Sequence, residues 1–164
     1  MKYCTLPSGL SLVQIYRQKA GDYPKFFKMD TLSRLGFLLT EMLVADDPNR
    51  FMPRQDRAVL VFSREGCVAN DLHYVESMAD FPSPGLFVYT LPNIVAGEVC
   101  IRNKYAGESS AFVLEQFDEE KIFQMVRLSF QDPQTRSAIV IWADCPTDNE
   151  WDARAWLVEK EDLL

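Results

Sequence analysis

The chain has 164 residues with a formal net charge of −7, and 48% of its residues are apolar. This length and apolar content predict one globular domain over residues 1–164 and exclude a disordered chain. The acidic balance excludes broad electrostatic attraction to nucleic acid.

The four cysteines, which include Cys4 and Cys67, are widely spaced and form no CxxC pair. We expect free, reduced thiols, because a chain with this much core does not need disulfides. The N-terminus lacks the apolar core of a signal peptide and no apolar run approaches a membrane span, so we expect a cytoplasmic protein. His73 is the single histidine, and the composition predicts neither a metal site nor a cofactor.

The first third of the chain contains an expected strand and an expected helix. Residues 10–16 partly alternate between apolar and polar side chains, which predicts a strand. Asp30 or Thr31 can cap a helix that continues to about Ala45. Apolar side chains recur on one face of that helix at helical spacing.

Two continuous apolar runs indicate strands that are buried on both faces, as in a parallel sheet. They are residues 57–62, with sequence RAVLVF, and residues 137–143, with sequence SAIVIWA. A helix is expected to begin at 69–71, with Leu72, Val75, Met78 and Ala79 at helical spacing. Another helix is expected from Asp118 to Ser129, and a last strand over residues 151–159.

The central stretch, residues 82–114, reads as a loop, a helix and a buried strand. Thr90 can cap the helix and Pro92 is tolerated in its first turn. Gly97 is a poor helix former, so we predict that another backbone approaches closely there. Gly107 can take the left-handed position after the helix.

The same stretch carries a motif in which a Ser-Pro pair is followed, in this order, by Phe, Thr, Pro-Asn, Ala-Gly, Ile and Gly. Its residues are Ser83, Pro84, Phe87, Thr90, Pro92, Asn93, Ala96, Gly97, Ile101 and Gly107. In order and spacing this motif resembles the β-ketoacyl synthases, the thiolase-like condensing enzymes of fatty-acid and polyketide synthesis. The resemblance extends across nearly all of the chain and corresponds to the N-terminal half of a condensing enzyme.

Buried strands that alternate with amphipathic helices indicate an α/β protein. The resemblance implies a single thiolase-like half, with a mixed, mostly parallel five-stranded sheet and helices on both faces. It also implies that the last strand is antiparallel to its neighbour.

In the family a nucleophilic cysteine follows the strand at residues 110–114. A gap-free count from Gly107 places Gln116 at that position, and no cysteine lies between Cys100 and Cys145. An amide cannot replace a thiolate as nucleophile. The half that carries the family's histidine pair and lysine has no counterpart here, so the resemblance implies a non-catalytic accessory protein.

The resemblance also implies an interface, because the family's nucleophile strand pairs with its copy across a dimer axis. The interface residues would be Phe112, Val113 and Leu114, in a homodimer or in a heterodimer with a full-length ketosynthase. An acyl carrier protein would be a further partner. The alternative is that a loop or helix of the same chain covers this apolar edge.

A different reading makes the protein an enzyme. Cys67 lies at a helix start, where its pKa can be lowered, and His73 lies six residues further on. This pair would serve a thiol-dependent acyl transferase or thioesterase. The alternative for both residues is structural packing. A third reading makes the chain one half of a split enzyme.

Overall fold

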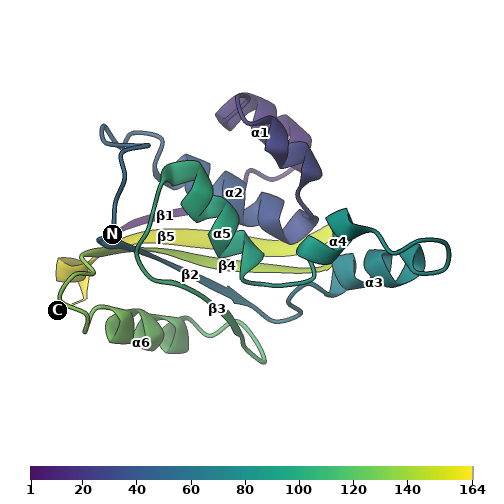
Figure 1. Ribbon diagram of the computed structural model, residues 1–164. Helices are drawn as coiled ribbons and strands as arrows, with labels where there is room; N and C mark the ends of the chain where they lie inside the picture. The colour runs from purple at the N-terminus through teal and green to yellow at the C-terminus, as the bar shows by residue number, and fades with distance from the viewer. Residues whose placement is uncertain (164) are drawn as a thin grey trace.

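The computed structural model describes residues 1–163 (Figure 1). Its strands are β1 (Lys2–Thr5), β2 (Arg57–Ser63), β3 (Ser109–Val113), β4 (Ser137–Thr147) and β5 (Glu150–Glu159). Its α-helices are α1 (Leu12–Lys19), α2 (Thr31–Leu43), α3 (Val68–Ser77), α4 (Pro84–Val88), α5 (Ile94–Asn103) and α6 (Glu119–Ser129). Two 3-10 helices are η1 (Pro24–Lys28) and η2 (Lys160–Asp162).

The strands form one five-stranded sheet in the order β1-β5-β4-β2-β3. β2 runs parallel to both β3 and β4, whereas β5 is antiparallel to both β4 and β1. Four strands therefore run in one direction and β5 runs in the other. This arrangement confirms the expected mixed sheet and its antiparallel last strand.

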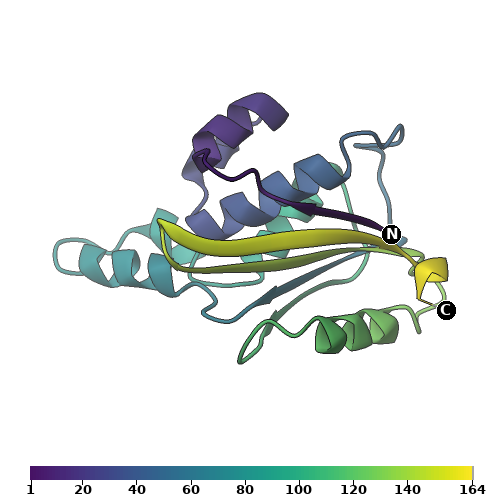
Figure 2. The same ribbon diagram turned by 180° about the vertical axis from the view of Figure 1, so that it is seen from behind.

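Helices cover both faces of the sheet (Figures 1 and 2). α1, α2 and α5 lie on one face and α6 lies on the other. Along β2 and β4, Val61 and Ile141 point toward the first layer, and Phe62 and Trp142 point toward α6. Because both faces are covered, the strands read as continuous apolar runs rather than as alternating ones.

The predicted strand over residues 10–16 is wrong, because these residues begin helix α1. Ser11 caps α1 in a capping box: its hydroxyl accepts a hydrogen bond from the Gln14 amide, and the Gln14 side chain accepts one from the Ser11 amide. The buried side chains Ile15 and Tyr16 then lie on the helix face that meets the core. The first strand is β1, which pairs with β5 at an edge of the sheet.

The predicted helix in the central stretch begins later than expected. Asn93 precedes the first residue of α5, so Thr90 and Pro92 lie before the helix. The expected loop also contains α4, whose cap is Ser83: its hydroxyl accepts a hydrogen bond from the Leu86 amide at 3.3 Å. Pro84 occupies the first position of α4, where its missing N–H is not needed.

The glycine predictions are corrected as well. No atom lies within 4 Å of a Cβ built on Gly97, whereas a Cβ on Gly36 of α2 would collide with Val95 of α5. The close approach between these two helices is therefore made at Gly36. Lys104, with φ of 58°, takes the left-handed position after α5. Position 107 requires glycine for a different reason: a Cβ there would lie 2.8 Å from the Gln55 carbonyl oxygen, which leaves no room for a side chain.

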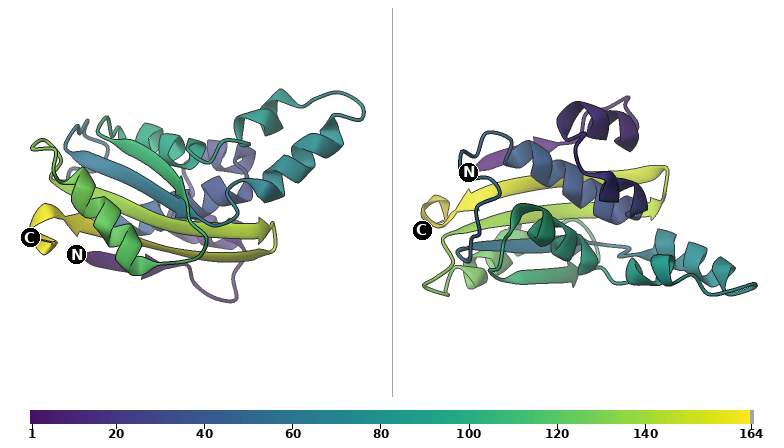
Figure 3. Two further views of the ribbon diagram at one scale, coloured as in Figure 1. Left: turned by 90° about the horizontal axis from the view of Figure 1, so that it is seen from below. Right: turned by 45° about the horizontal axis from the view of Figure 1, so that its top comes forward.

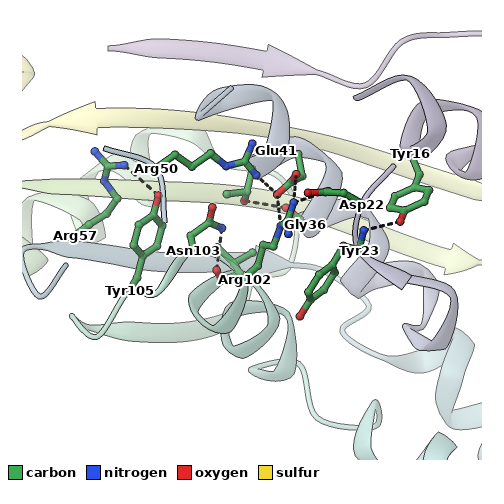
Figure 4. A network of polar contacts seen from close by, with 12 residues as sticks. Tyr16, Asp22, Tyr23, Gly36, Glu41, Arg50, Arg57, Arg102, Asn103 and Tyr105 are labelled. Atoms are coloured by element: carbon green, nitrogen blue, oxygen red, sulfur yellow. Dashed lines mark hydrogen bonds and ion pairs between the residues drawn. The ribbon is translucent and has the colours of Figure 1, made fainter. Parts of the chain in front are cut away.

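A buried ion network joins α2 and α5 to the segment before β2 (Figure 4). Glu41 of α2 is only 1% exposed and forms ion pairs with Arg50 and with Arg102, whose Nε lies 3.2 Å from Glu41 Oε1. Arg102 also contacts Asp22 at 2.7 Å. The Phe51 ring lies 4.8 Å from the Arg102 guanidinium, which adds a cation–π contact.

Candidate functional site

β3 forms an open edge of the sheet. It pairs with β2 on one side, and none of residues 1–163 adds a strand on its other side. The main-chain groups on that side can therefore pair with a strand from another chain. Val113, at the end of β3, is 62% exposed.

The three side chains predicted for an interface lie in different surroundings. Val113 is largely exposed, Phe112 is half-buried and stacks on Phe62 with ring centroids 5.1 Å apart, and Leu114 is buried. Only Val113 thus offers most of its surface to a partner. Strand pairing itself uses main-chain atoms, and within residues 1–163 those on the outer side of β3 have no partner strand.

Gln116 lies in the bend between β3 and α6, where its side chain is exposed. α6 follows at once, with Asp118 as its cap and with Glu119 and Glu120 in its first turn. Three carboxylates at a helix start oppose the stabilisation of a further negative charge there. The Gln116 amide can donate and accept hydrogen bonds but cannot form a thioester.

The Cys67 thiol is buried just before α3. Burial, together with a smaller effect of the Asp30 and Asp71 carboxylates, raises the pKa of this thiol to about 12. The expected lowering of its pKa by the helix start is therefore outweighed. His73 pairs instead with Asp148, since its Nε2 lies 2.6 Å from a carboxylate oxygen of that residue.

Alkylation by iodoacetamide tests this assignment directly. At about pH 7.5 we expect Cys67 in the folded protein to react at least about tenfold more slowly than a cysteine in a short peptide, because so little thiolate is present. Peptide mapping by mass spectrometry separates Cys67 from the other cysteines. Unfolding in denaturant should restore the peptide rate, and a fast reaction in the folded protein would revive the thiol-enzyme reading.

Asp148 joins three segments at the turn between β4 and β5. Its carboxylate accepts a hydrogen bond from the Thr31 hydroxyl at 2.5 Å and contacts His73 of α3. The hydrogen bond to Asp148 is the main cause of a raised His73 pKa, and Glu76, 3.9 Å from Nδ1, adds to it. The bonds to Thr31 and His73 hold the pKa of Asp148 below its usual range.

This pairing predicts a pH-dependent stability. The raised His73 pKa contributes stability that is fully present below about pH 6.5, the unfolded value, and is lost as the pH rises through the higher folded value. We therefore expect the difference in Tm between the wild type and His73→Gln to shrink from about pH 5.5 to about pH 8.5. A constant difference across that range would contradict the ion pair.

Two neighbouring pockets, of about 540 and 480 Å³, lie between the start of α2, α3 and α4 and share Asp30 and Asn70 in their walls. In the larger pocket, buried Glu98 accepts a hydrogen bond from the Tyr89 hydroxyl at 3.0 Å and contacts Lys25 at 2.8 Å. Within residues 1–163 no group of three or more His, Cys, Asp or Glu side chains is placed to hold a metal ion.

The apolar residues that lie at helical spacing on α3 are exposed. Leu72 is 58% and Val75 61% exposed, and Met78 is also exposed. α3 and α4 project from the body of the protein as an arm (Figure 3). An apolar surface of this kind is typical of an interaction site. Sequence reasoning missed it because apolar periodicity does not say what a helix face packs against.

No protein-family model matches the sequence, and no curated protein does. Solved structures do match. The ishigamide ketosynthase/chain length factor has a TM-score of 0.73 and 16% identity over 93% of this chain. The chain has a ketosynthase-like fold. It spans about half, 48%, of the length of that matched chain.

A second structure with this fold is a ketosynthase (ApeO) in complex with its chain length factor (ApeC) from Xenorhabdus doucetiae. The TM-score is 0.66 at 16% identity, and the match covers 98% of this chain and 77% of that one. The ketosynthase-like fold agrees with the motif in residues 83–107 and with the mixed five-stranded sheet. Among residues 1–163 no helix combines the length and apolar character needed to cross a bilayer.

Proposed function

We propose that the protein is a non-catalytic ketosynthase-like chain that acts as an accessory subunit in fatty-acid-like or polyketide-like biosynthesis. It would pair through β3 with a second ketosynthase-like chain, either a copy of itself or a full-length ketosynthase. The observation that carries this proposal is the open edge at β3. The bend that follows β3 contains Gln116, which the gap-free count from Gly107 assigns to the family's cysteine position.

Three features support the proposal. The neighbours in fold include a ketosynthase in complex with its chain length factor, which is an assembly of two chains. The Gln116 amide cannot serve as a nucleophile. The buried Cys67 thiol, with its pKa raised to about 12, is protonated at neutral pH and offers no substitute.

The physical basis of pairing is strand addition. An incoming strand would satisfy the unpaired main-chain groups of β3 and would cover the exposed Val113 side chain. Such an edge, left open, is a site of aggregation, so a specific partner also protects the chain. An acyl carrier protein of the same cytoplasmic pathway is the further partner in this proposal, since it would deliver chains to the assembled pair.

The test is Val113→Lys, because a lysine on an edge strand disfavours the addition of another strand. The native mass is measured for the protein alone and after co-expression with a full-length ketosynthase of the same organism. We expect the wild type to assemble in at least one of these samples and Val113→Lys to remain monomeric in both.

Leu128→Lys is the matched control, since Leu128 is equally exposed, at 62%, but lies on α6. This variant should assemble like the wild type. An unchanged mass for Val113→Lys, or equal disruption by both variants, would contradict pairing through β3.

A further inference from the structure

The larger of the two pockets contains a buried carboxylate. Glu98 of α5 lies in the wall of this cavity of about 540 Å³ and is only 4% exposed. Its Oε1 accepts the hydrogen bond from the Tyr89 hydroxyl. Its Oε2 is buried and accepts no hydrogen bond from any group within residues 1–163, although the Lys25 ammonium forms an ion pair with it at 2.8 Å. A ligand that donates a hydrogen bond to Oε2 would satisfy this oxygen.

Lys25 contacts Glu98 from the solvent side of the pocket. Its side chain is 41% exposed and comes from the short 3-10 helix η1. An ammonium on a flexible stem is strongly hydrated and can return to water. Glu98 cannot follow it, because it lies on α5 and is buried. Lys25 therefore occupies a position that the ammonium of another molecule can take.

The charges around this position favour a cation. Burial, together with the Glu98 and Asp30 carboxylates, raises the pKa of the Tyr89 hydroxyl. Burial is also the main cause of a raised pKa of Asp30. Two carboxylates thus act on one partly desolvated space, whereas Lys28, the other lysine of the wall, is exposed to solvent. A positive charge is stabilised in such a place.

The rest of the wall favours an organic cation over a metal ion. Met29, Leu86 and Val88 contribute apolar side chains to the pocket. Two carboxylates are too few to hold calcium or magnesium without many waters. The single free oxygen of Glu98 suits an ammonium better than the planar fork of a guanidinium, which pairs with two oxygens. The volume is in the range of pockets that bind small molecules.

We propose that this pocket binds an aliphatic primary amine, whose ammonium displaces Lys25 from Glu98. The exchange of one ammonium for another leaves the number of buried charges unchanged, so contact of the aliphatic chain with Met29 and Leu86 supplies the net affinity. The described wall comes from η1, α3, α4, α5 and the residues that cap or adjoin them, and not from β3. The inference is therefore independent of the pairing through β3.

The probe is n-pentylamine, which is protonated at about pH 7. Its binding to the full chain is measured by NMR, from the shifts of the backbone amides around Leu86 and Tyr89. We expect saturable binding with a Kd in the millimolar range, as for a very small ligand. The comparison ligands 1-pentanol and pentanoate have the same chain length, and we expect each to bind at least about tenfold more weakly, since neither brings a cation to Glu98.

Two variants test the roles of the charged residues. Glu98→Gln keeps an oxygen for the Tyr89 hydroxyl but removes the charge, and we expect it to weaken binding of n-pentylamine at least about tenfold. Lys25→Met removes the competing ammonium and should tighten binding at least about fivefold. Lys28→Met is the matched control, since it makes the same charge change at an exposed position of the rim and should alter the Kd less than about twofold.

Circular dichroism checks that each variant is folded, and Lys25→Met and the comparison ligands test the inference even if Glu98→Gln does not fold. Equal binding of 1-pentanol, an unchanged Kd in Glu98→Gln, or no tightening in Lys25→Met beyond that in Lys28→Met would overturn the inference. Binding to Lys25→Met alone, with none to the wild type at about 20 mM amine, would also overturn it, because Lys25 would then be a permanent partner of Glu98.

Discussion

Glu41→Gln is expected to lower the free energy of unfolding by about 3 kcal/mol. The substitution keeps the size of a side chain that is 1% exposed but removes the charge that Arg50 and Arg102 share. Two guanidinium groups are then left together without their common carboxylate, apart from the contact of Arg102 with Asp22. We place the effect at the lower end of the range for broken buried pairs because both arginines retain some contact with water.

Urea unfolding followed by circular dichroism measures this loss. Glu76→Gln is the control, since Glu76 is exposed and its removal should change the free energy of unfolding by less than about 0.5 kcal/mol. A loss of less than 1 kcal/mol in Glu41→Gln would mean that the network positions the segment before β2 without contributing much to stability.

Gly36→Ala is expected to destabilise the protein by about 1 to 3 kcal/mol, although alanine is the better helix former. The new methyl group would collide with Val95, whose buried, β-branched side chain has little freedom to move. α2 and α5 would have to separate, which loosens the layer that covers β2 and β4.

Gly97→Ala, on α5, is expected to have the opposite effect on the stability of the protein. Its Cβ has no neighbour within 4 Å, so the substitution should stabilise the protein by about 0.5 to 1 kcal/mol through helix propensity alone. The same urea experiments measure both changes. A loss of stability in Gly97→Ala, or a gain in Gly36→Ala, would contradict the packing between these helices.

Much of the fold is predictable because burial on both faces leaves an unmistakable pattern. The runs at residues 57–62 and 137–143 are confirmed as β2 and β4, and the caps at Asp30 and Asp118 start α2 and α6 as expected. The strand prediction for residues 10–16 was wrong because it relied on their partial alternation of apolar and polar side chains. Ser11 and Gln14, three residues apart, are the signal of a capping box and indicate a helix.

The candidate site was harder to predict from the sequence, because its main features depend on whether a side chain is buried or exposed in the folded protein. Periodicity placed Leu72 and Val75 on one helix face, but only the fold decides that this face looks outward. The available signal was the opposite face, where Asn70 and Ser77 can anchor the helix by hydrogen bonds. Likewise, the raised pKa of Cys67 follows from burial, which no local pattern encodes.

The position of β5 between β1 and β4 has a consequence for how the chain folds during synthesis. Lys2 of β1 pairs with Leu157 of β5, so β1 can join the sheet only after β5 has been synthesised. Pairings this distant in sequence make folding slow and leave strand edges open in the meantime. We therefore expect β1 to stay unpaired and protease-sensitive in a nascent chain that ends before Glu150.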